Sequence, residues 1–124
     1  MTSNVAAGDT TGGMFAAIDA KDTEAFVAYL SDDAVFRFGS APAVQGRAAI
    51  RQAVDQFFGT IAGSKHTIAK SLCEGQTRVV EGAVTYTRLD DSQVTLPFTD
   101  VFEYEGDLIA QYKIYIDVSP LYAA

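Results

Sequence analysis

The sequence predicts an α+β fold in which three N-terminal helices pack on one face of a strongly curved antiparallel β-sheet. Apolar residues recur at helical spacing before Ser64 and at alternate positions after it, which places helices first and strands second. Short turns join the later segments, and short connections favour antiparallel neighbours. Gly82 and Pro97 interrupt two of these segments, so we expect a bulge or a strong bend there. A bent sheet that closes over helices forms a cone with a hollow mouth.

Three segments carry the helical pattern, at residues 14–22, 23–31 and 47–61. Asp22 is the kind of residue that caps a helix N-terminus, so it marks the start of the second helix. Gly63 follows the third segment, and glycine is common just past the end of a helix. We therefore expect three helices before the sheet begins.

Five segments have the composition of β-strands, which are rich in β-branched and aromatic residues. One of them precedes the third helix and is separated from it by a loop with Gly and Pro at residues 39–46. The other four follow one another and predict an antiparallel meander. The five segments are residues 33–38, 65–75, 77–89, 93–106 and 107–118.

The chain of 124 residues has the length of one domain, and its apolar content is that of a globular protein. We expect residues 1–10 to form a flexible N-terminus and residues 11–124 to form the domain. The N-terminus lacks the basic start and apolar centre of a signal peptide, and no segment is long enough to span a membrane. Cys73 is the only cysteine, which excludes an internal disulfide and fits a reducing compartment. These features predict a cytoplasmic protein.

The net charge of −7 argues against two classes of partner. Nucleic acids and anionic membranes both attract basic surfaces, so neither is expected to bind. The sequence has no glycine-rich phosphate loop, so no nucleotide cofactor is expected. His66 is the only histidine, so a metal site built on a pair of histidines cannot form. We therefore expect a protein that works without a cofactor or a metal ion.

Asp100 is the strongest functional signal in the sequence. It lies among the phenylalanines of the stretch LPFTDVFEY, at a position where strand alternation requires a core residue. An ionised carboxylate among phenyl rings costs several kcal/mol unless it is paired, so the group either pairs or stays protonated. A protonated Asp100 would serve in a pocket as an acid or as a hydrogen-bond donor to a developing oxyanion. The alternative is a structural pair with Arg88 or Tyr86 on the neighbouring strand.

Three further polar residues have two interpretations each. Asp117, near the end of the last strand, either lines the mouth of the pocket or caps the turn before Pro120. Arg88 either clamps a carbonyl or anionic ligand or lies at a solvated strand end. His66 is more typical of a structural residue, although its place near the sheet rim would allow it to reach the cavity.

Three segments of the chain resemble the nuclear transport factor 2-like superfamily, and within it the SnoaL-like and ketosteroid-isomerase-like group. The segments are residues 14–36, 39–58 and 96–121. Their pattern is two helices, then Asp-Asp-Ala and a strand, then Gly-Arg-Ala-Ala-Ile at the start of a helix. The resemblance implies a cone-shaped domain that often pairs through its open sheet face. It does not fix an activity, because this fold hosts isomerases, cyclases, hydrolases, dehydratases and non-catalytic modules.

Comparison with the ketosteroid isomerases implies a role for Asp100. It stands where those enzymes have an aspartic acid that apolar surroundings keep neutral and that donates to the oxyanion. Met14 stands where they have a second donor, a tyrosine. Arg37 or Phe38 stands where they have the aspartate that moves the proton. The resemblance therefore implies one of the three functional groups of that mechanism.

Comparison with the limonene-epoxide hydrolases implies roles for Arg88, Asp90 and Asp117. Those enzymes use one aspartate to activate water, an arginine to position it and a second aspartate to protonate the epoxide oxygen. Arg88 and Asp90 have the required Arg-x-Asp spacing, and Asp117 matches the remaining aspartate. Phe36 and Phe38 stand where that family has the tyrosine and asparagine that help to hold the water. The resemblance therefore implies part of the hydrolase machinery.

We predict catalytic roles for Asp100, Asp117 and Arg88, and a pocket for a small apolar organic ligand that carries a carbonyl, enol or epoxide oxygen. The residues expected to line this pocket are Met14, Phe36, Phe38, Phe58, Tyr86, Phe98, Phe102 and Tyr112. The favoured function is cofactor-free acid–base catalysis by a SnoaL-like isomerase, cyclase or hydrolase. One alternative is a non-catalytic binding module of the same fold. Another is a homodimer, paired through the threonine-rich open face of the sheet, without a small-molecule role.

Overall fold

The computed structural model describes residues 10–123, which contain four helices and a six-stranded sheet. The predicted flexible N-terminus lies outside the described residues except for Thr10. The helices are α2 (Thr11–Asp19), α3 (Thr23–Val27), α4 (Arg47–Phe58) and α5 (Ser119–Tyr122). The strands are β1 (Leu30–Phe38), β2 (Val44–Gln45), β3 (Gly63–Glu74), β4 (Thr77–Thr87), β5 (Gln93–Glu105) and β6 (Leu108–Tyr115).

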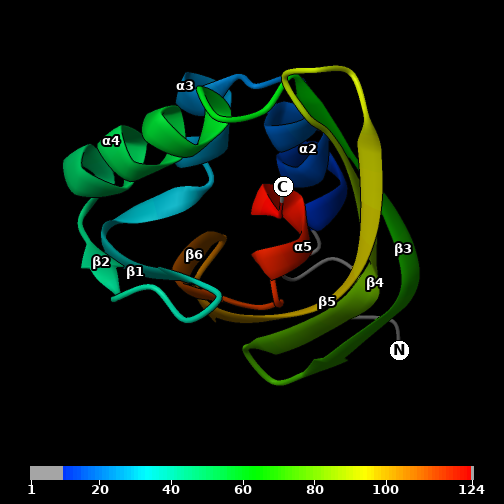
Figure 1. Ribbon diagram of the computed structural model, residues 1–124. Coiled ribbons are helices and arrows are strands. Elements are labelled where there is room, and N and C mark those ends of the chain that lie inside the picture. Colours follow the sequence, from blue (N-terminus) through cyan, green and yellow to red (C-terminus); the bar gives the residue numbers. More distant parts are fainter. Residues whose placement is uncertain (1–9, 124) are drawn as a thin grey trace.

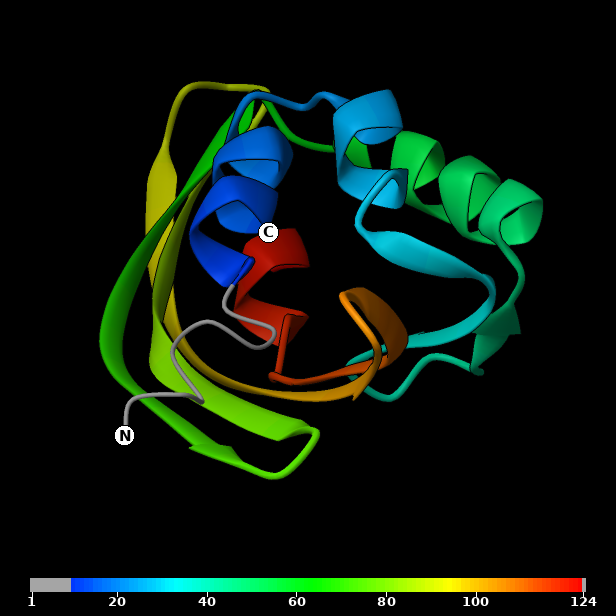
Figure 2. The same cartoon turned by 180° about the vertical axis from the view of Figure 1, so that it is seen from behind.

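The sheet wraps around the helices and so forms the predicted α+β cone (Figures 1 and 2). Its strand order is β2-β1-β6-β5-β4-β3, and α2, α3 and α4 close the open side of the curve. The meander from β3 to β6 is antiparallel, as predicted. The expectation of a wholly antiparallel sheet is wrong for one pair, because β1 runs parallel to β6. A long crossover that contains α4 and the meander joins these two strands, and such a connection permits parallel pairing.

Two helices are shorter than the sequence predicts. The helix predicted over residues 23–31 ends at Val27, because Leu30 already pairs with Ile109 of β6. Non-local strand pairing here outweighs the local helical pattern. The helix predicted over residues 47–61 ends at Phe58, where Gly59 forms the cap.

Two short elements, β2 and α5, were not predicted. β2 lies in the expected loop at residues 39–46 and consists of two residues that pair with β1. α5 follows the last strand and has proline in its first turn, where a missing backbone N–H carries no penalty. Asp22 caps α3 as predicted, and its carboxylate accepts a hydrogen bond from the backbone N–H of Ala25 at 3.1 Å.

The predicted bend at Gly82 is confirmed by a bulge in the neighbouring strand. The register between β3 and β4 shifts between Ile68 and Lys70, opposite this glycine. A side chain at Gly82 would collide with the carbonyl oxygen of Thr67, so only glycine permits the close approach. The register between β4 and β5 does not shift at Pro97, so no bulge forms there.

The concave face of the sheet and the inner faces of the helices form one core. Alternate residues of β5 from Leu96 to Tyr104 are buried, which confirms the period of two in this segment. No helix in the described part of the chain is both long and apolar enough to cross a lipid bilayer.

Candidate functional site

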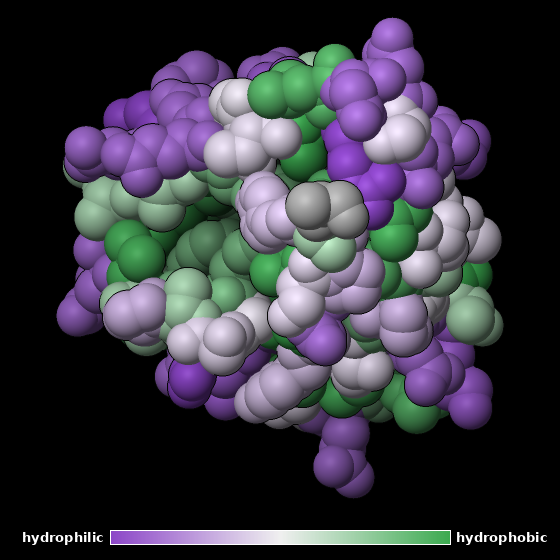
Figure 3. All heavy atoms as spheres, viewed as in Figure 1, coloured by the Kyte–Doolittle hydropathy of each residue, from purple (hydrophilic) through white to green (hydrophobic). Residues whose placement is uncertain are grey.

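The cone encloses a cavity of about 190 Å³ between the concave face of the sheet and α4. Figure 3 shows its hydrophobic hollow between α4 and the β1–β2 segment. Most of the side chains that line the cavity are aliphatic or phenylalanine. The lining residues with polar side-chain groups are His66, Tyr86, Asp100 and Tyr112. The cavity therefore suits an apolar molecule with very few polar atoms.

Asp100 points into the interior from the middle of β5, as strand alternation predicts. It is 1% exposed. The hydroxyl of Tyr112, on β6, donates a hydrogen bond to its Oδ2 at 3.0 Å. Its Oδ1 is buried and has no hydrogen-bond partner among the described residues. The partner of Asp100 is thus Tyr112 and neither Arg88 nor Tyr86.

Burial raises the pKa of Asp100 from 3.8 to about 8, although the hydrogen bond from Tyr112 acts in the opposite direction. Burial also raises the pKa of Tyr112, and the nearby Asp100 raises it further. At neutral pH both groups are therefore protonated. Because Oδ2 accepts from Tyr112, the carboxyl hydrogen of Asp100 belongs on Oδ1, where it is available as a donor.

Tyr86 contributes a second hydroxyl to the cavity wall. Its ring is 3% exposed and packs edge-on against Phe57, with the ring centroids 5.7 Å apart. Burial, followed by the charge of Asp100, raises the pKa of its hydroxyl. Tyr86 is therefore a neutral donor in the same hollow.

His66 lines the cavity from β3 and is held on three sides. Its ring packs against Phe15 and Phe98, at centroid distances of 4.8 and 5.4 Å. Its Nδ1 is 2.6 Å from Oδ1 of Asp19, and its backbone N–H donates to Oδ2 of Asp19 at 2.9 Å. The hydroxyl of Ser64 also donates to Asp19, at 2.9 Å. Asp19 thus anchors the imidazole from the end of α2.

The protonation state of His66 follows from two opposing effects. Burial lowers its pKa below 6.5 and outweighs the hydrogen bond and the charge of Asp19, which raise it. The imidazole is therefore neutral at pH 7. Because a carboxylate only accepts, the hydrogen lies on Nδ1 and the lone pair on Nε2.

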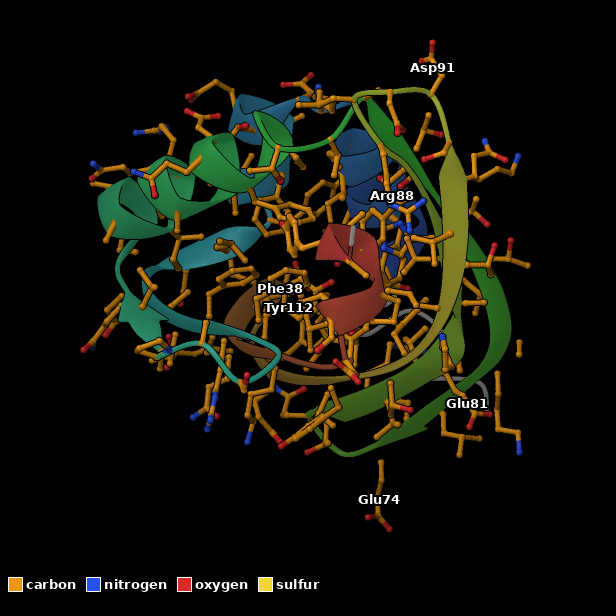
Figure 4. All side chains as sticks on the ribbon, viewed as in Figure 1. Phe38, Glu74, Glu81, Arg88, Asp91 and Tyr112 are labelled. Atoms are coloured by element: carbon orange, nitrogen blue, oxygen red, sulfur yellow. The ribbon has the colours of Figure 1, made fainter. Side chains whose placement is uncertain are left out.

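Most of the residues predicted to line the pocket do line this cavity. Those that do are Phe36, Phe38, Phe58, Tyr86, Phe98 and Tyr112. Figure 4 labels Phe38 and Tyr112, which both lie inside the cone. Met14 and Phe102 do not line it; both lie in the packed core and are 0% exposed.

The structure does not bring Arg88 and Asp117 to Asp100. Arg88 lies beside α5 (Figure 4) and donates to the carbonyl oxygens of Leu121 and Pro120 at 3.0 and 2.9 Å. Asp117 is exposed and accepts from the backbone N–H of Ser119 at 2.9 Å. Hydrogen bonding from the side chain of Ser119, followed by that from its backbone, lowers the pKa of Asp117. Both residues therefore secure the C-terminal turn.

The other aspartate of the hydrolase comparison also lies outside the cavity. Asp90 forms a turn, in which its Oδ1 accepts from the hydroxyl of Ser92 at 2.6 Å and from its backbone N–H at 3.0 Å. The described residues therefore do not gather the Asp-Arg-Asp set that the resemblance implies.

The sequence did not predict Asp19 as the partner of His66. One signal was present, because Asp19 is the last residue of α2 and an acidic side chain at a helix C-terminus is unfavourable unless it is paired. Only the packing of α2 against β3 identifies the partner.

Comparisons with known proteins agree with this fold. A family model described as a SnoaL-like domain matches residues 12–112. A Catenulispora acidiphila protein with a ketosteroid isomerase-like fold, crystallised with trimethylamine, is 16% identical, with a TM-score of 0.82 over 90% of this chain and 87% of that one. No curated protein matches the sequence significantly.

Two further solved structures are of an epoxide hydrolase and a putative polyketide cyclase. An LEH-like epoxide hydrolase of M. tuberculosis is 19% identical, with a TM-score of 0.75 over 87% of this chain and 80% of that one. A putative SnoaL-like polyketide cyclase from Jannaschia sp. is 14% identical, with a TM-score of 0.79 over 91% and 86% of the two chains. At these identities the likeness establishes the fold alone.

Proposed function

Because the chain belongs to the SnoaL-like family, we propose that it is a small-molecule enzyme that performs cofactor-free acid–base chemistry in its apolar cavity. The observation that carries this proposal is Asp100, a buried carboxyl group whose Oδ1 has no partner in the described chain. Burial of such a group costs stability, and an apolar side chain at the same position would avoid that cost. A protein that required only a stable fold would therefore gain nothing from this buried carboxyl group.

The chemistry starts from the neutral form of Asp100. Its Oδ1–H donates to a carbonyl, enol or epoxide oxygen of the substrate, while Tyr112 donates to Oδ2 and polarises the carboxyl group. As negative charge develops on the substrate oxygen, this hydrogen bond strengthens in the low-dielectric cavity and stabilises the transition state. Tyr86 supplies a second donor from the same wall. Isomerisation, cyclisation and epoxide opening all use this type of stabilisation.

The substrate class follows from the lining of the cavity. A compact and mostly hydrocarbon molecule with one or two oxygen atoms fills an apolar hollow of about 190 Å³ and meets its few polar groups. Solved structures of the same fold include one with trimethylamine, one epoxide hydrolase and one putative polyketide cyclase. These related structures support a small organic ligand.

The test compares the wild-type protein with Asp100→Asn and with a matched control, Asp107→Asn, at the exposed turn after β5. Two compact probes represent two reaction types: β-isophorone for double-bond isomerisation and limonene oxide for epoxide opening. We expect the wild type and the control to convert at least one probe, and Asp100→Asn to be at least about a hundredfold slower. Equal rates in Asp100→Asn and the wild type would refute the proposal. A co-purified ligand recovered chemically unchanged would favour the non-catalytic binding module.

We also propose that the protein is a cytoplasmic homodimer that pairs through the outer face of the sheet and binds neither nucleic acid nor membrane. The hydroxyls of Thr85 and Thr95 lie 2.9 Å apart on this face. Tyr115, which pairs with Thr99 farther along β5, is 58% exposed. Light scattering after size-exclusion chromatography should give the mass of two chains, and Thr85→Arg should reduce it to one. A single-chain mass for the wild type contradicts the dimer.

A further inference from the structure

The cavity contains a second reactive group, the imidazole of His66. It lines the same hollow as Asp100, and its free nitrogen is Nε2. Among the described residues, nothing hydrogen-bonds to Nε2, whereas Nδ1 is engaged by Asp19. An imidazole with one nitrogen held by a carboxylate and the other left bare has the arrangement of a general base.

Hydrogen bonds and ring contacts fix the orientation of the His66 imidazole, although Nε2 has no partner among the described residues. The carboxylate of Asp19 accepts from Nδ1, from the backbone N–H of His66 and from the hydroxyl of Ser64. Phe15 packs against the ring in a tilted arrangement and Phe98 in an edge-on arrangement. These contacts fix the imidazole through Nδ1 and the ring carbons and leave Nε2 free to meet a molecule in the cavity.

The charged and titratable neighbours of His66 are compatible with its role as a general base. Asp19, from α2, is the carboxylate in contact with it, and Tyr86 and Asp100 share the cavity wall. Burial lowers the pKa of His66 more than Asp19 raises it, so the ring is uncharged at neutral pH. When the ring takes up a proton, the adjacent carboxylate stabilises the imidazolium.

The distance between His66 and Asp100 indicates that a substrate would lie between their side chains. His66 pairs with Val84 on β4, and Val84 pairs with Leu96 on β5, four positions before Asp100. Strand spacing and rise therefore place the two Cα atoms about 16 Å apart along the sheet, too far for a direct hydrogen bond. The sheet is strongly curved (Figure 1), and both residues line the same hollow.

We propose that Nε2 of His66 removes a carbon-bound proton from an enolisable carbonyl compound whose oxygen is held by Asp100, and that Asp19 positions the imidazole. This inference rests on the proposed function of Asp100 and adds the base and the substrate class. The C–H bond breaks, its electron pair enters the π-system of the enolate, and an N–H bond forms on His66. Asp100 keeps its proton and donates a hydrogen bond to the enolate oxygen. Return of the proton from His66 to a different carbon gives the isomer with a shifted double bond, so no co-reactant is needed.

The first test reads the tautomer of His66 directly by ¹⁵N NMR of the full chain. His66 is the only histidine, so its ring signals need no assignment by mutation. At pH 7 we expect a hydrogen on Nδ1 and a bare Nε2. Asp19→Asn should lower the pKa of His66 further and reduce the population of this tautomer, whereas Asp107→Asn should change neither. A hydrogen on Nε2, or a charged ring, in the wild type at pH 7 overturns the inference.

The second test measures deuterium uptake from D₂O into isophorone, a compact apolar enone with exchangeable C–H groups at two distances from its oxygen. We expect His66→Gln to slow the uptake catalysed by the wild type at least about a hundredfold, and Asp19→Asn to slow it at least about tenfold. A wild-type rate in His66→Gln, with the rate lost in Asp100→Asn, overturns the inference and leaves the proposed function standing. A wild-type rate in Asp100→Asn, with the rate lost in His66→Gln, overturns the proposed function instead.

Discussion

Replacement of Asp100 by asparagine should remove a large pH dependence from the stability of this protein. The folded state holds the carboxyl group in its neutral form, with a pKa raised by burial from 3.8 to about 8. The unfolded chain releases that proton above pH 4 or so. Between these two values the folded state therefore binds one proton more than the unfolded state, and stability falls as pH rises.

The size of this pH dependence follows from the shift in the pKa of Asp100. Each pH unit inside this window lowers the free energy of unfolding by about 1.4 kcal/mol, so the interval from pH 5 to pH 8 accounts for about 4 kcal/mol. The contribution is fully present below the unfolded pKa and is lost as pH rises to the folded value. Asparagine at this position keeps an oxygen that can accept from Tyr112 and does not titrate. The variant should therefore gain stability over the wild type as the solution becomes more alkaline.

The assay is urea unfolding at pH 5, 6, 7 and 8 for the wild type, Asp100→Asn and the control Asp107→Asn. The free-energy difference between Asp100→Asn and the wild type should grow by about 4 kcal/mol over this range. Parallel stability curves for these two proteins would refute the reasoning, because they would mean that Asp100 is already ionised in the folded state. The same variant should lose activity, so stability and function would move in opposite directions at one residue.

Three further predictions concern other residues of the site and its frame. Tyr112→Phe removes the hydrogen bond that lowers the pKa of Asp100, so the alkaline limb of the pH–rate profile for β-isophorone should shift to higher pH. An unshifted limb would contradict the hydrogen bond between Tyr112 and Asp100. Gly82→Ala forces a methyl group against the backbone of β3 and should cost about 1–3 kcal/mol in urea unfolding, with Gly59→Ala as the control; equal losses in both contradict the close approach. Arg88→Gln loses hydrogen bonds to two carbonyl groups of α5 and should lower stability by about 1–2 kcal/mol; an unchanged unfolding midpoint would argue against this role.

The fold was predictable because it depends mainly on local patterns. The change from helical to alternating spacing after Ser64 identified the order of the elements, and the glycine at position 82 identified the bend. The end of α3 was not predictable in this way. The segment after Val27 has a helical pattern, yet pairing of Leu30 with β6 depends on residues about 80 positions away in the sequence.

The site was predictable at Asp100 but not in its partners. Alternation alone places this carboxylate in the core. In the observed register, however, Val80 is the residue of β4 opposite Asp100. Arg88 is eight positions farther along that strand, or about 26 Å away at the usual rise, so it cannot be the partner. Tyr112 is a diagonal neighbour on β6 and reaches Asp100 because its side chain is long.

The bulge at Gly82 links the fold to the chemistry. On β4, Val84 lies beside His66 and Val80 lies opposite Asp100, and Gly82 falls midway between them. The bulge that β3 makes opposite Gly82 is therefore located between the two proposed catalytic residues. A flat sheet would hold these side chains parallel and about 16 Å apart, whereas a sheet bent at this point directs both toward one small substrate. The glycine that breaks the strand pattern thus shapes the cavity, and the aspartate that breaks the apolar pattern supplies its hydrogen-bond donor.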